Sequence, residues 1–127
     1  MSYDQVIITV DDSSTMRRII KNTLQKLGFS NVLEAGNGIE ALDQMAKSSK
    51  IDIIITDWNM PEMDGLTYVK TVRTKDQYKE TPILMITTEA AKDDILTALK
   101  SGVNNYVVKP FTPETLQEKV FKLLGIE

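Results

Sequence analysis

The chain has 127 residues, with 15 Lys and Arg against 18 Asp and Glu, 42% hydrophobic side chains, and neither His nor Cys. The missing residue types exclude imidazole bases, thiol nucleophiles, thiolate metal sites and disulfides, so a bound metal must have oxygen ligands, which favours Mg²⁺, Mn²⁺ or Ca²⁺. The net charge of −3 argues against nucleic-acid binding, and the length suits one domain.

Short apolar runs, several of them rich in β-branched residues, predict strands that are buried on both faces, as in a parallel sheet. In chain order they are Val6–Val10, Val32–Leu33, Ile51–Ile55, Ile83–Ile86 and Tyr106–Val108. These runs are far too short to cross a bilayer. We therefore expect a soluble, cytoplasmic protein without membrane insertion.

Stretches with helical spacing of apolar residues follow each predicted strand. The first ends at Gly28, a residue typical of helix ends, and the last begins with Thr112 as cap and Pro113 in the first turn. The predicted buried stripes are Met16, Ile19, Ile20, Leu24 and Leu27; Ile39, Leu42, Met45 and Ala46; Leu66, Val69 and Val72; Ile95, Leu96 and Leu99, stopping near Gly102; and Leu116, Val120, Leu123 and Leu124. Strands alternating with helices predict an α/β fold, with helices on both faces of a parallel sheet. We expect one domain over residues 1–127, without an effector domain.

Two further segments need interpretation. Residues 36–41, Gly-Asn-Gly-Ile-Glu-Ala, fit a dinucleotide-binding pattern, but they follow the second predicted strand rather than the first. We interpret them as a turn and a helix start. The basic run Arg17, Arg18 and Lys21 is interpreted as the solvated face of the first helix.

Polar residues directly follow four of the predicted strands. They are Asp11 and Asp12 after the first strand, Asp57 after the third, Thr87, Thr88 and Glu89 after the fourth, and Lys109 after the fifth. In an open α/β sheet, ligands bind where the carboxyl ends of the strands meet, so these side chains are expected at one edge.

Three carboxylates at one edge would repel each other, by about 4 kcal/mol for a pair roughly 4 Å apart at an intermediate dielectric. The cluster should therefore take up a proton or bind a cation, and its oxygen ligands fit Mg²⁺. The alternative is that the acids are exposed loop residues, with Asp12, Ser13 or Ser14 capping the first helix.

A carboxylate beside Mg²⁺ and a lysine can attack phosphorus and form an aspartyl phosphate. Asp57 is the strongest candidate because it ends the most apolar, and hence most central, strand. Asp11 and Asp12 suit metal ligation. Taken singly, Thr87 and Lys109 are also consistent with an ordinary strand end and a surface lysine, and Tyr106 with an amphipathic strand.

Three strings go further: VDDSSTMRR at residues 10–18, DWNMP at 57–61 with MDG at 63–65, and YVVKPFT at 106–112. Together they resemble the receiver domain of two-component response regulators, and within that family the single-domain chemotaxis regulators of the CheY type, over essentially the whole chain. The resemblance implies a flavodoxin-like receiver fold, with five helices around a five-stranded sheet in the order 2-1-3-4-5. Proteins of this type are themselves the known example of that strand order, so the order comes from the resemblance.

The resemblance also implies a role for each site residue. Asp57 would accept a phosphoryl group from a histidine kinase of the CheA type. Asp12, Asp57 and the backbone carbonyl of Asn59 would hold Mg²⁺, with Asp11 acting through water. Thr87 and Lys109 would contact the phosphoryl oxygens, and the Lys109–Pro110 bond would be cis.

The same resemblance implies which residues transmit phosphorylation to a partner-binding surface. Tyr106 would change rotamer as Thr87 moves and would alter the surface of the fourth helix, fifth strand and fifth helix, which would bind the flagellar switch protein FliM. Asn59 and Glu89 would modulate hydrolysis of the phosphoryl group. A phosphatase is a further partner, which the sequence does not identify. We expect a monomer that is a switch rather than an enzyme, beyond its own phosphorylation and dephosphorylation.

Alternatives remain open at this point. The chain would also suit a stand-alone receiver in another phosphorelay. An aspartyl-phosphate phosphohydrolase should have D-x-D after the first strand, where Ser13 stands instead. A flavodoxin-like electron carrier would need a glycine-containing phosphate cradle in place of the acidic residues 11–15.

Overall fold

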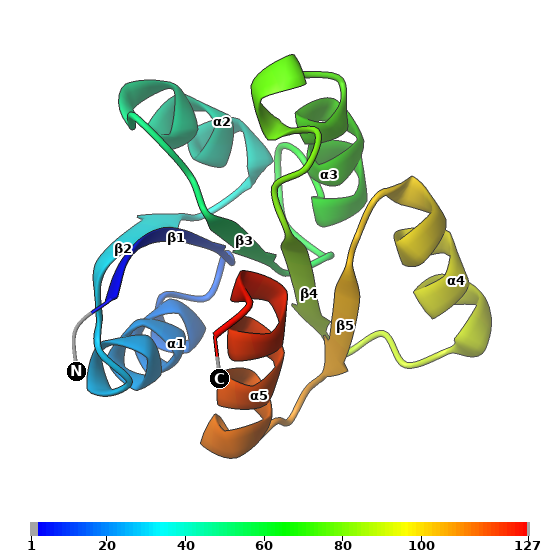
Figure 1. The fold of residues 1–127 in the computed structure, drawn as a ribbon. Helices are drawn as coiled ribbons and strands as arrows, with labels where there is room; N and C mark the ends of the chain where they lie inside the picture. Colours follow the sequence, from blue (N-terminus) through cyan, green and yellow to red (C-terminus); the bar gives the residue numbers. More distant parts are fainter. Residues whose placement is uncertain (1–2, 127) are drawn as a thin grey trace.

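The computed structural model describes residues 3–126; Met1, Ser2 and Glu127, at the ends of the predicted domain, lie outside the described residues. Strands and helices alternate along the described chain (Figure 1). The elements are β1 (Tyr3–Val10), α1 (Ser14–Lys26), β2 (Phe29–Ala35), α2 (Gly38–Lys47), β3 (Ile53–Thr56), α3 (Gly65–Arg73), the short 3-10 helix η1 (Asp76–Tyr78), β4 (Ile83–Thr87), α4 (Lys92–Ser101), β5 (Asn105–Val108) and α5 (Pro113–Leu124).

The strands between residues 3 and 126 form one parallel, five-stranded sheet in the order β2-β1-β3-β4-β5. The predicted fold class and strand order are confirmed. Strand β3 lies at the centre and all of its residues are buried, which explains why its sequence is apolar without alternation. Val10 pairs with Thr56, and Thr56 with Met85, so β1 and β3 end level with each other beside β4.

The predicted strands differ from the observed ones at their ends: β1 begins at Tyr3 rather than Val6, and β4 and β5 are each one residue longer than predicted. Strand β2 runs over Phe29–Ala35 rather than Val32–Leu33, because it pairs along β1 from Tyr3 onwards. Strand β3 begins at Ile53 rather than Ile51. There the carboxylate of Asp52 accepts a hydrogen bond from the N–H of Val6 at 2.7 Å, so a side chain takes part in the pairing before the ladder begins.

Helices cover both faces of the sheet (Figure 1). Helices α1 and α5 pack on one face, and α2, α3 and α4 on the other. Successive strand residues serve the two layers in turn: on β1, Ile7 joins the core under α1 and α5, and Ile8 joins the opposite core.

Side-chain caps begin several helices, as their sequences predict. Thr112 caps α5 with Pro113 in the first turn, and Ser13, rather than Asp12 or Ser14, caps α1 by accepting the N–H of Met16. Residues 36–41 are a turn and a helix start, because the side chain of Asn37 caps α2. The predicted cap of α5 and the predicted turn and helix start at residues 36–41 are confirmed.

The predicted buried stripes were wrong at several large residues. Ile19, Ile39, Leu96 and Leu99 are exposed, and so is Ala46. The buried face of each helix is narrower than its apolar stripe. Helix α4, for example, is fully buried only at Ala98, so Leu96 and Leu99 point away from the sheet.

Arg73, the last residue of α3, organises the opposite edge of the sheet from the acidic residues. Its guanidinium donates hydrogen bonds of 2.7–3.1 Å to the carbonyl oxygens of Tyr78, Lys79, Thr81 and Gly102 and to the side chain of Asn104. Burial lowers the pKa of Arg73 below its ordinary value. This one side chain therefore joins α3, the segment after η1 and the turn before β5.

We expect Arg73→Met to lower the free energy of unfolding by about 2 kcal/mol, because several carbonyls lose a charged donor at once. Urea unfolding measures the loss. Lys70→Met, on the exposed side of the same helix, is the control and should change stability by less than about 0.5 kcal/mol. Equal losses in the two variants would show that the guanidinium contacts contribute nothing.

Within residues 3–126, the helices are all too short or too polar to span a bilayer.

Candidate functional site

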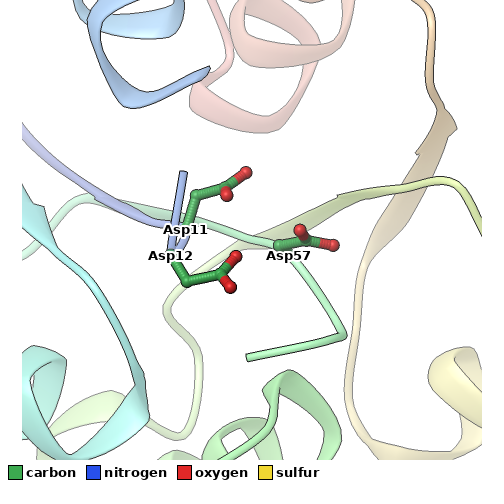
Figure 2. Close-up of side chains that lie close together, drawn as sticks. All are labelled: Asp11, Asp12 and Asp57. Carbon is green, nitrogen blue, oxygen red and sulfur yellow. The ribbon is translucent and has the colours of Figure 1, made fainter. Parts of the chain in front are cut away.

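Carboxylates from two neighbouring strands meet at the carboxyl edge of the sheet. Asp11 and Asp12 follow β1, and Asp57 follows β3 (Figure 2). One carboxylate oxygen from each residue lies within 4.8 Å of those from the other two. The structure therefore brings together the three acids that the sequence singled out.

Asp57 is held by the end of the central strand. Its N–H donates to the carbonyl of Val10 at 2.8 Å, which extends the pairing between β1 and β3 by one residue. One carboxylate oxygen accepts the N–H of Trp58 at 2.6 Å, and the other lies 3.1 Å from the Lys109 ammonium. The residue is 9% exposed, so its carboxylate has a defined position yet can still be reached from solvent.

Asp11 is more deeply buried than Asp57. Its carboxylate accepts the N–H of Ser13 at 2.9 Å and lies 3.1 Å from the ammonium of Lys109. Burial raises the pKa of Asp11 above its ordinary value, and the nearby charge of Asp57 adds to this, although Ser13 and Lys109 act in the opposite direction. Asp12, in contrast, is exposed.

Lys109 supplies the positive charge at this edge. Its side chain is only 14% exposed, and burial by itself disfavours the ammonium. The hydrogen bonds and charges of Asp11 and Asp57 outweigh burial, so the pKa of Lys109 lies above its ordinary value. The following Lys109–Pro110 bond is cis, as the resemblance implied.

The donor set fits a hard divalent cation. Three carboxylates lie close together and a single ammonium pairs with two of them, so charge at the cluster remains unbalanced, and every candidate ligand atom is an oxygen. The exposed Asp12 leaves one side of the cluster open to water, which suits Mg²⁺ because this ion keeps several of its waters.

Glu89 connects the remaining predicted site residues. Thr87, the last residue of β4, is fully buried, and its hydroxyl accepts the N–H of Glu89 at 3.4 Å. The Tyr106 hydroxyl donates to the carbonyl of Glu89 at 2.6 Å, and the amide of Asn59 donates to its carboxylate at 2.9 Å. The strand ends predicted Thr87 and Glu89 at this edge, and the resemblance added Asn59 and Tyr106. Neither predicted that Glu89 contacts the other three.

Arg17 corrects the interpretation of the basic run on α1. Its guanidinium donates to the backbone carbonyl of Asp11 at 2.5 Å and pairs with Glu34 at 3.3 Å, and Lys21 pairs with Glu34 as well. Arg18 is exposed as predicted. Arg17 and Lys21 are thus only partly exposed, because the carboxylate of Glu34 on β2 lies beside that side of α1.

Gly65 is a second residue whose role the sequence alone did not reveal. It begins α3, and its N–H donates to the carbonyl of Trp58 at 2.7 Å. A Cβ atom on Gly65 would lie 2.0 Å from the carbonyl oxygen of Asp57. The start of α3 therefore packs directly on the backbone that carries Asp57, at a distance that only glycine permits.

Tyr106 predicts a measurable pH dependence of stability. Burial, followed by the charges of Asp94, Glu89 and Asp57, raises the pKa of Tyr106 from about 10 to about 12. Above pH 10 the unfolded chain loses this proton before the folded chain does, so the contribution of Tyr106 to stability falls as the pH rises towards 12.

We therefore expect wild type to be about 1 kcal/mol more stable than Tyr106→Phe near neutral pH, owing to the hydrogen bond to Glu89, and to lose that advantage between about pH 10 and pH 12. Thermal unfolding of both proteins across this range tests the prediction. The phenylalanine variant keeps every other titrating group, so a constant difference between the two would contradict the assignment.

Comparisons with known proteins agree with this geometry. The family model for the response regulator receiver domain matches residues 7–121. The chain is 58% identical over 119 residues to a chemotaxis protein CheY homolog of Campylobacter jejuni, an alignment that covers 94% of this chain and 92% of that protein.

Solved structures show the same likeness. The chemotaxis response regulator CheY4 of Vibrio cholerae superposes with a TM-score of 0.88 at 41% identity, covering 96% of this chain and all of that one. A receiver domain of a sensor histidine kinase from Pseudomonas aeruginosa superposes with a TM-score of 0.87 at 28% identity, covering 97% of this chain and 99% of that one. That domain has a magnesium ion coordinated in its active-site cleft.

Proposed function

This chain belongs to the response regulator receiver family, whose members are signalling switches rather than conventional enzymes, and on that premise we propose that Asp57 is its phosphoryl acceptor. The observation that carries the proposal is the position of the Asp57 carboxylate, which lies among Asp11, Asp12 and Lys109 at the open edge of the sheet. The chain would act as a single receiver domain of a two-component system, in the chemotaxis to which its relatives' names refer.

The phosphoryl donor would be the phosphohistidine of a CheA-type histidine kinase. An oxygen of Asp57 attacks phosphorus and forms an O–P bond, while the P–N bond to the kinase breaks and the imidazole keeps the electron pair and takes up a proton. Lys109 stays close to Asp57 and offsets the charge on the transferred group, and the Thr87 hydroxyl donates to one of its oxygens.

Magnesium is the proposed cofactor. Asp12, Asp57 and the backbone carbonyl of Asn59 would hold it, with Asp11 acting through water. Bound there, Mg²⁺ supplies positive charge that offsets the transferred group. The cluster of three acids, only two of which pair with Lys109, is the feature of this chain that supports the assignment.

The contacts of Glu89 suggest how phosphorylation reaches the output surface. If Thr87 turns its hydroxyl towards a phosphoryl group, it releases the N–H of Glu89, whose carbonyl holds Tyr106. Tyr106 would then change rotamer and alter the surface of α4, β5 and α5, where Leu96, Leu99 and Val108 are exposed. This surface would bind the flagellar switch protein FliM.

Removal of the phosphoryl group would involve two further residues, Asn59 and Glu89. Asn59 and Glu89 hydrogen bond to each other at 2.9 Å, two residues beyond Asp57 and Thr87 respectively, and would there lie beside the water that attacks the phosphorus. We assign both a role in modulating hydrolysis, alone or with a phosphatase. The protein would work in the cytoplasm as a monomer.

Trp58 offers a direct test because its backbone N–H donates a hydrogen bond to the Asp57 carboxylate, which places this fluorescent residue next to the site. We expect its fluorescence to change on addition of Mg²⁺ and to change again with acetyl phosphate, and we expect EDTA to prevent the second change. Intact mass should show one added phosphoryl group.

The matched control for this test is Asp57→Asn, which keeps the shape of the side chain and removes the nucleophile. It should take up no phosphoryl group, a loss of at least about 100-fold in labelling rate. Labelling of the variant at the wild-type rate would refute Asp57 as the acceptor.

A further inference from the structure

The outer side of α2 carries a hollow that the phosphorylation site does not use. Its volume is ≈ 570 Å³, and it lies between α2 and the loop joining β3 to α3, with Glu62 on the loop side. A second hollow of ≈ 190 Å³ continues past Leu42 and Ala46 towards Lys75 and Tyr78. We call the two together the α2 groove. Helix α2 lies at the periphery of the fold, beside α3 (Figure 1).

The floor of the α2 groove is apolar. Ile39, Leu42 and Ala46 are spaced i, i+3 and i+7, so they form one stripe along about 10 Å of the helix. Ile39 is 53% exposed, the largest exposed fraction of any large hydrophobic side chain in residues 3–126. The sequence pattern predicted this stripe as core, but the described chain leaves Ile39 and Ala46 uncovered.

The groove is held in shape by the packing of its two walls. The N–H of Gly38 donates to the carbonyl of Met63 at 3.2 Å, and a Cβ atom on Gly38 would lie only 2.7 Å from the Met63 side chain. Glu62 has a φ of +66°, an unusual conformation for a residue other than glycine. A partner would therefore meet a preformed surface, which lowers the entropic cost of binding.

The rim of the larger hollow is acidic, whereas Lys75 lines the smaller one. Glu40, Asp43 and Glu62 line the larger hollow, and within the described structure only Asp43 has a cationic partner, the exposed Lys47. This charge disfavours an anionic lipid surface. A symmetric contact between two copies of the chain would place the acids of one rim against those of the other. The chemistry fits a cationic partner.

We propose that the α2 groove docks an amphipathic, basic helix of another protein. Its apolar side chains would cover Ile39, Leu42 and Ala46, and its lysines or arginines would lie over Glu40 and Glu62. A helix suits the stripe because ridges at the same spacing interlock. A stripe of three apolar side chains offers only a small contact area. We therefore expect transient binding, with a dissociation constant in the micromolar range or weaker. The proposal does not depend on phosphorylation of Asp57.

Amide chemical shifts of the ¹⁵N-labelled full chain test this docking. The probe is a capped synthetic helix of about 15 residues built from Leu and Lys with one leucine face. A second peptide with Glu in place of Lys is the charge control. We expect saturable shifts centred on residues 37–46 and 61–63 with the lysine peptide, and at least tenfold weaker binding of the glutamate peptide.

Variants locate the binding surface. Ile39→Asp should weaken the lysine peptide at least tenfold, and Glu62→Gln threefold or more. Ile19→Asp, which changes an exposed isoleucine on α1, should leave binding unchanged, and circular dichroism verifies that all three variants are folded. Shifts centred on α4 or α1, equal binding of both peptides, or no saturable shift would each overturn the proposal.

Discussion

A Gly65→Ala chain is expected to lose about 3 kcal/mol of its free energy of unfolding, at the upper end of what overpacking costs. The added Cβ would lie 2.0 Å from the carbonyl oxygen of Asp57 and 2.9 Å from the Cα of Trp58. Both are backbone atoms, so no side-chain rotation relieves the contact. Either α3 or the Asp57 segment must move, and the hydrogen bond from Gly65 to Trp58 breaks with it.

The sign of this prediction is opposite to that of helix propensity. Within a helix, alanine is favoured over glycine by about 1 kcal/mol, so propensity alone predicts that Gly65→Ala stabilises α3. Urea unfolding decides between the two effects. Gly36→Ala is the matched control, because a Cβ there would meet only side-chain atoms at 3.5 Å or more, and we expect a change below about 0.5 kcal/mol. An unchanged or more stable Gly65→Ala chain would show that the contact is easily relieved.

Gly65→Ala should also weaken metal binding, because it displaces the strand end that carries Asp57. A Mg²⁺ titration followed by Trp58 fluorescence measures this effect. Gly36→Ala should bind Mg²⁺ as wild type does. A destabilised Gly65→Ala chain with unchanged Mg²⁺ affinity would place the strain elsewhere in α3.

Lys109→Met is expected to cost a similar amount, about 3 kcal/mol near neutral pH, because it leaves two buried carboxylates without their cation. The ammonium lies 3.1 Å from both Asp11 and Asp57, whose side chains are 3% and 11% exposed. Methionine keeps most of the volume of the lysine side chain, so the loss reports the charge rather than a cavity.

The deficit of Lys109→Met should shrink as the pH falls. Burial already raises the pKa of Asp11, and loss of the ammonium raises it further, so the folded variant binds a proton that the unfolded chain does not. Stability of the variant relative to wild type therefore rises as the pH is lowered from about 8 towards about 5. Urea unfolding in EDTA at both ends of this range measures the effect.

Magnesium should recover part of the same loss, because a bound cation neutralises the unpaired acids. Labelling by acetyl phosphate should nevertheless be at least about tenfold slower than in wild type, since the charge beside the transferred group is missing. Lys100→Met, at an exposed position of α4, is the control and should match wild type in both measurements. A pH-independent deficit in Lys109→Met would mean that Asp11 and Asp57 do not depend on Lys109.

Sequence reasoning predicted the site better than it predicted the helix faces. Asp11, Asp57, Thr87 and Lys109 each stand directly after, or at the end of, an apolar run, and parallel strands deliver their ends to a common edge. In contrast, the apolar stripe of α4 contains Leu96 and Leu99, yet the helix is fully buried only at Ala98. The width of a buried face depends on how a helix sits on the sheet, which the stripe itself does not contain.

The order of strands and helices, the cap at Thr112 and the residues that gather at the acidic edge could be predicted from the sequence, because these follow from local patterns and from the direction of parallel strands. Only the tertiary structure decided that Arg17 holds the backbone of Asp11, that Gly65 packs against Asp57, and that Arg73 joins three distant segments. Arg73 contacts residues as many as 31 positions away, Gly65 depends on a close approach of two backbones, and Arg17 depends on how α1 lies beside the end of β1. Their partners exist only once the sheet and both helical layers are in place.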